Sequence, residues 1–149
     1  MHPRAVVELY SRNRAFQRAQ DRFNRTPRLL SHTDLEGEKF DAVVIGADIV
    51  WDYVRPNLGQ DPVYFGTHIN APLKISLAAS CGRVSVDNEP PAYVVDGLKQ
   101  LSSISVRDAN TQQMVKKYAD RDSEIICDPA FHLDITAHTE VPKEDHPYL

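Results

Sequence analysis

A chain of 149 residues, 42% of them hydrophobic, can bury one core, so its length favours a single domain or one lobe of a larger protein. No stretch approaches the ~18 consecutive apolar residues of a membrane-spanning helix. The N-terminus also lacks the apolar run and small-residue cleavage site of an export signal. We therefore expect a cytoplasmic protein without a transmembrane segment.

The formal net charge of −4 conceals an uneven distribution. Residues 1–28 hold seven arginines and two carboxylates, a sum of +5, whereas the remainder holds ten basic and nineteen acidic groups, a sum of −9. A basic segment can meet nucleic acid or anionic lipid. However, Leu9, Phe16 and Phe23 recur every seven residues, which predicts an amphipathic helix over 1–30 that packs on protein and keeps its arginines solvated. Because no later stretch interleaves basic and aromatic residues, we expect no nucleic-acid binding.

Apolar segments follow a polar connector and predict strands near 40–46, 73–79, 103–107 and 123–127. The first, FDAVVIG, is almost continuously apolar, which is typical of a strand covered on both faces.

Helical patterns at 92–101 and 109–119 alternate with the last three strands, and Asp108 precedes the second helix as its expected N-cap. This alternation predicts a parallel sheet with right-handed crossovers. The predicted fold class is α/β: a Rossmann-like three-layer lobe over 31–140 with a mostly parallel sheet, followed by a truncated linker at 141–149.

Polar or small residues follow each predicted strand, where ligands bind in open parallel sheets. Gly46 permits a close backbone approach, and Asp48 would lie at the crevice as an acceptor or base. Trp51 would offer a flat apolar face to a sugar, with Ser80 and Arg107 at neighbouring strand ends. The pattern leaves open a second interpretation, in which Asp48 caps a short helix and Trp51 belongs to the core.

No motif in the chain indicates a cofactor or a metal. Cys81 and Cys127 have no Cys-x-x-Cys partner and lie in small or apolar surroundings, which predicts two unpaired, buried thiols. The six histidines are scattered without metal-ligand spacing, so we expect no metal. The fingerprints of dinucleotide-binding proteins, P-loop proteins and α/β-hydrolases are also missing from the sequence.

Five motifs occur in a fixed order: FDAVVIGADIVW, VYFG, KISLAASCG, ISVRD and IICDPAFHL, within a region of roughly 16–133. Together they resemble the polysaccharide pyruvyl transferase family. The resemblance implies an enzyme of two Rossmann-like lobes, similar to GT-B glycosyltransferases, that transfers pyruvate from phosphoenolpyruvate onto a sugar as a ketal. Its acceptor would be a cell-surface exopolysaccharide or a precursor of one.

On this resemblance, Asp48 is the expected catalytic residue, and Gly46, Trp51, Ser80 and Arg107 are expected to bind substrate. The resemblance covers the middle and end of a first lobe only. We therefore expect a partial enzyme that is inactive without a second lobe or a partner chain.

The motifs differ from the family's usual residues at several positions: Ala47 stands for serine, Ile49 for glutamine, Leu77 for tyrosine, Cys81 for phenylalanine, Asp108 for glutamate and Ala130 for threonine. The changes at 47 and 49 remove polar groups beside Asp48 that a sugar or phosphate would use. An alternative function is therefore a non-catalytic α/β binding or interaction module that has lost the reaction.

Overall fold

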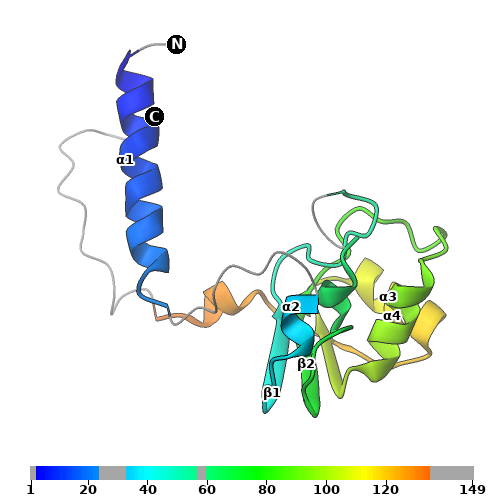
Figure 1. Cartoon of the computed structure of the whole chain (residues 1–149). Helices are drawn as coiled ribbons and strands as arrows, with labels where there is room; N and C mark the ends of the chain where they lie inside the picture. The colour runs from blue at the N-terminus through cyan, green and yellow to red at the C-terminus, as the bar shows by residue number, and fades with distance from the viewer. Residues whose placement is uncertain (1–2, 24–32, 57–59, 135–149) are drawn as a thin grey trace. The chain divides into compact units, whose positions relative to one another are not determined.

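The computed structural model describes residues 3–23, 33–56 and 60–134 (Figure 1). The chain divides into two compact units, residues 1–31 and 32–149, and each is described by itself. Within the described ranges, no helix has both the length and the apolar character needed to cross a membrane.

The first unit contains α1, an 18-residue helix over Pro3–Gln20. The aromatic rings of Tyr10 and Phe16 are exposed on it, and the Arg14 guanidinium lies 6.0 Å from the centre of the Tyr10 ring. The Leu9 side chain and residues 24–30 of the predicted helix lie outside the described part. Packing of this helix on protein therefore stays a prediction.

The second unit contains a four-stranded sheet with the order β1-β2-β3-β4 and every pair parallel. Its strands are β1 (Ala42–Gly46), β2 (Leu73–Ala79), β3 (Ser103–Val106) and β4 (Glu124–Ile125). The helices α3 (Ala92–Gln100) and α4 (Ala109–Ala119) connect the last three strands and pack on one another. The predicted fold class, a three-layer α/β arrangement with a parallel sheet, is confirmed. The described part of this unit also contains three short helical segments: α2 (Thr33–Glu36), η1 (Pro62–Phe65) and η2 (Pro129–His132).

The two faces of the sheet differ in burial. Ile45, Ile104 and Val106 point into the core, where residues of α3 and α4 cover them. Residues that pair across parallel strands share a face, and the register pairs Ala42 with Leu73. Val44 and Leu73 therefore lie on the opposite face, where both are exposed in the described lobe.

An aromatic cluster is formed by the buried rings of Trp51 and Phe65 and the partly buried ring of Tyr93. The Trp51 and Phe65 rings stack with centroids 5.8 Å apart, and Tyr93 meets Phe65 edge-on at 5.7 Å. Trp51 Nε1 donates a 2.8 Å hydrogen bond to the Tyr64 carbonyl. Gly97 of α3 packs so closely that a Cβ there would lie 2.6 Å from the carbonyl oxygen of Phe65.

The fourth strand is shorter than predicted, and this changes the position of one cysteine. Cys81 is buried, as expected, but the predicted burial of Cys127 is wrong because its side chain is exposed. β4, which among the described strands lies at the edge of the sheet, ends at Ile125, and both of its residues are already exposed. Both cysteines are unpaired.

Candidate functional site

The loop after β1 is tied to the end of β2. Gly46 has φ +127°, and a Cβ at this position would overlap the Leu77 carbonyl oxygen, so only glycine fits without rearrangement. Ser80 N donates to the Asp48 carbonyl, and Trp51 N donates to the Ser80 carbonyl, both at 3.0 Å. These bonds hold Asp48 beside the carboxyl end of β2.

Asp48 presents its carboxylate to solvent, with 80% of its side chain exposed. One carboxylate oxygen lies 3.5 Å from Nη2 of Arg107, which follows β3. Arg107 Nη1 contacts Asp128, which follows β4, at 3.1 Å. Three strand ends therefore converge through one guanidinium and two carboxylates.

No helix begins at Asp48 in the described chain. The next helical segment is η1, and its N-cap is Asp61, whose side chain accepts a hydrogen bond from Val63 N. Asp48 instead adopts a left-handed conformation with φ +70° and accepts a hydrogen bond from Ile49 N. Asp48 therefore does not cap a helix, and the capping interpretation is wrong.

Ser80 is 3% exposed and lies behind Asp48 and Arg107. Its hydroxyl donates a 2.7 Å hydrogen bond to Asp108 and accepts one from Gly82 N. Asp108 in turn caps α4 by accepting from Thr111 N at 2.8 Å, as the sequence predicted. Ser80 thus links the end of β2 to the start of α4.

The two carboxylates that follow β3 and β4 both have lowered pKa values. For Asp108, partial burial acts to raise the pKa, but hydrogen bonds from Ser80 and Thr111, with the neighbouring Arg107, outweigh it. For Asp128, the hydrogen bond from Ala130 N is the main cause, and Arg107 adds to it. Both groups are therefore held as acceptor-only carboxylates near neutral pH.

Trp51 lies in the aromatic cluster with 0% exposure, so in this structure its ring offers no surface to a sugar. The structure brings four predicted residues together, with Gly46 as the turn, Asp48 and Arg107 at the surface and Ser80 beneath them.

We call Asp48, Ser80, Arg107, Asp108 and Asp128 the strand-end cluster. Sequence reasoning did not assign Asp128 to the site, although its place directly after a predicted strand is the signal that identifies it.

Cys81 lies beneath this cluster without a redox partner. Its sulfur contacts Thr111 Oγ1 at 3.3 Å and Asn110 Nδ2 at 3.2 Å, and burial raises the pKa of its thiol. Within the described ranges, no group of three or more His, Cys, Asp or Glu side chains has the geometry to hold a metal ion.

The parallel sheet, with charged residues gathered at its carboxyl edge, defines the class of this unit, an α/β domain. The chain matches the family model described as polysaccharide pyruvyl transferase over residues 1–148, and it belongs to that family. No curated protein and no solved structure matches it.

Proposed function

We propose that this chain forms the acceptor-side lobe of a cytoplasmic pyruvyl transferase that acts on a cell-surface polysaccharide or its precursor. The observation that carries the proposal is the convergence of Asp48, Arg107 and Asp128 at one sheet edge in a member of this family. Phosphoenolpyruvate is the donor that the family resemblance implies. A second lobe, in the same protein or in a partner chain, would supply the groups that bind its phosphate.

The reaction joins two sugar hydroxyls to one carbon of phosphoenolpyruvate. Its methylene carbon takes up a proton, the first hydroxyl oxygen adds to the neighbouring carbon, and the second displaces phosphate. One hydroxyl proton replaces the proton used at the methylene, and the other leaves with the phosphate. No oxidation is involved, so the protein needs an acid, a base and positive charge, without a redox cofactor.

Asp48 suits the role of base because its carboxylate is exposed at the edge and held by its backbone bond to Ser80. Arg107 contributes the positive charge, and Asp128 fixes the orientation of its guanidinium through Nη1. Gly46 allows the chain to turn tightly below the substrate. Trp51 supports this loop from the core, rather than contacting the sugar.

One observation favours the alternative, a non-catalytic binding module. Asp48 and Arg107 already contact one another, and their neighbours Ala47 and Ile49 bring no polar side chain to the edge. A lobe that keeps the fold and binds a saccharide without reacting would show the same arrangement. Measuring transfer and binding separately distinguishes the two functions.

The test uses this chain together with the second lobe and measures ketal formation by mass spectrometry and phosphate release from phosphoenolpyruvate. Asp48→Asn is expected to reduce transfer by about 10²-fold or more, within the ~10²–10⁴-fold range of general-base contributions. Its effect on unfolding free energy should stay below about 1 kcal/mol because the ion pair is exposed.

Asp120→Asn is the matched control, since Asp120 is also exposed, has φ +49° and pairs with Lys116. It should leave transfer unchanged. Unchanged transfer in the Asp48 variant would exclude the base role. The chain without the second lobe should form no ketal, and ketal formation by it would show that the second lobe is dispensable.

A further inference from the structure

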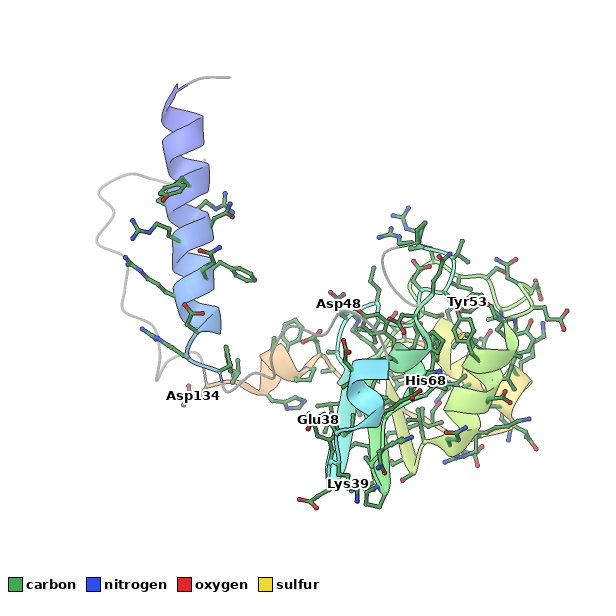
Figure 2. The ribbon with its side chains drawn as sticks, in the orientation of Figure 1. Glu38, Lys39, Asp48, Tyr53, His68 and Asp134 are labelled. Atoms are coloured by element: carbon green, nitrogen blue, oxygen red, sulfur yellow. The ribbon has the colours of Figure 1, made fainter. Side chains whose placement is uncertain are left out.

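A pocket of about 210 Å³ lies beside the strand-end cluster. It is formed by the loops that follow β1 and β2, further along the chain from Asp48 and Ser80. Figure 2 shows Asp48 and Tyr53 toward the upper side of the lobe, away from Lys39, which precedes β1. The lining residues are Asp52, Val54, Arg55, Arg83, Val84 and Asn88.

The pocket is connected to the cluster by a tight backbone contact. A Cβ on Gly82 would lie 3.4 Å from the carboxylate of Asp52, and Gly82 N donates to the Ser80 hydroxyl. Gly82 therefore links Asp52, on the wall of the pocket, to Ser80 of the strand-end cluster.

Asp52 is a carboxylate with only 4% exposure. It lies 3.2 Å from Nε of Arg55 and accepts a hydrogen bond from Val54 N. A buried carboxylate is costly unless it is paired, so the neighbouring arginine is required on one wall of the pocket. This contact involves Nε of the guanidinium, whereas bidentate recognition of an anion can use its terminal nitrogens.

Arg83 supplies a second guanidinium from the opposite loop. It is exposed, and among the described residues no side chain or backbone carbonyl pairs with it. The charge of Asp52 is offset by Arg55, so Arg83 leaves the pocket with a net positive charge. Asn88 adds an amide that can donate to an oxygen.

We propose that this pocket binds a phosphate group through Arg55 and Arg83. A carboxylate has two oxygens, and a single guanidinium can bind both of them. A phosphate group has three oxygens available, so it can accept hydrogen bonds from two arginines on different loops. The volume is below the ~300–1,000 Å³ of pockets that enclose a drug-sized molecule, so it suits one such group. If the proposed function holds, on which this last step rests, the phosphate belongs to the sugar acceptor.

The experiment titrates the full chain with inorganic phosphate, a sugar 1-phosphate and acetate at constant ionic strength, using calorimetry. Arg83→Gln removes a side chain without a described partner, so the variant should fold normally. It is expected to weaken phosphate binding by about 10-fold or more, as for loss of a charged hydrogen bond. Arg55→Gln should weaken it as well, but it also unpairs buried Asp52, so Arg83→Gln is the decisive variant.

Lys99→Gln, on the exposed side of α3, is the control and should bind phosphate as the unchanged chain does. Tighter binding of the sugar phosphate than of phosphate supports a phosphorylated acceptor, and equal binding supports recognition of the phosphate group alone. Absent binding, equal affinity for acetate, or full binding by Arg83→Gln would overturn the proposal. A failed Asp48 transfer test with intact phosphate binding would instead reject only the proposed function.

Discussion

Two residues of the loop after β1, only three positions apart, have opposite environments. Asp48 belongs to the strand-end cluster and has an 80% exposed side chain, whereas Trp51 belongs to the aromatic cluster and is fully buried. An exposed ion pair contributes ~0–1 kcal/mol to stability, but truncating a buried aromatic residue costs about 3–5 kcal/mol. The residue that stabilises the core and the residue proposed to contact a ligand are therefore separated within one short segment.

The largest expected effect is on the aromatic cluster. Trp51→Ala should lower the unfolding free energy by about 3–5 kcal/mol, because it leaves a cavity against Phe65 and removes the hydrogen bond to Tyr64. Denaturant unfolding of the chain measures the loss. Trp51→Phe should cost less because it keeps an aromatic ring, and an unchanged midpoint for the alanine variant would contradict the core role.

The contact between α3 and η1 provides the next test of the same cluster. Gly97→Ala should destabilise the lobe by about 1–3 kcal/mol, because the new methyl group meets the Phe65 side chain and carbonyl. Gly37→Ala is the control, since no atom lies within 4 Å of its new Cβ. Thermal unfolding compares the two variants, and equal melting temperatures would show that α3 moves aside freely.

A smaller effect on stability is expected at Asp108, the residue that joins the strand-end cluster to α4. Asp108→Ala should cost about 1–2 kcal/mol, the usual loss for an N-cap. Because the folded pKa of Asp108 is lowered, its contribution is present above the unfolded carboxyl pKa and disappears as pH falls through the folded value.

Unfolding measured from neutral to acidic pH should therefore show a smaller acid dependence in Asp108→Asn than in the unchanged chain. The asparagine keeps a capping oxygen but cannot titrate. An equal acid dependence would mean that other carboxylates determine the acid response.

Chemical labelling of the two cysteines tests which of their side chains is buried, and it is expected to have almost no effect on stability. A thiol reagent should label exposed Cys127 quickly and buried Cys81 slowly, since the raised pKa of Cys81 lowers its thiolate fraction at a given pH. Mass spectrometry of the labelled chain counts the modified sites. Cys127→Ser should abolish the fast reaction, and fast labelling that persists in this variant would mean that the lobe opens around Cys81.

Some features of the lobe could be predicted from the local sequence pattern. The apolar runs and their spacing predicted the parallel sheet, and Asp108 before a helical pattern predicted the N-cap of α4. These features depend on neighbours in the chain. The early end of β4, and with it the exposure of Cys127, depends on which strands pair in space.

For the site, the sequence predicted only which residues lie at the ends of the strands. Parallel topology brings residues after β1, β2 and β3 to one edge, so Asp48, Ser80 and Arg107 were expected to meet there. Their individual roles could not be predicted, because a serine hydroxyl can face a crevice or the cap of a helix while the neighbouring sequence stays the same. Ser80 turns to Asp108, and Arg107 finds Asp128 as well as Asp48.

The sequence by itself determined the order of the four strands and of α3 and α4, and the chemistry available at the carboxyl edge, since both follow from the spacing of apolar and polar residues along the chain. Only the tertiary structure decided which side chains face solvent. Trp51 is drawn into the core because Phe65, from a segment that sequence pattern did not assign, stacks on its ring and Tyr64 accepts its hydrogen. Asp48 remains outside because its backbone is fixed to Ser80 while its carboxylate reaches Arg107.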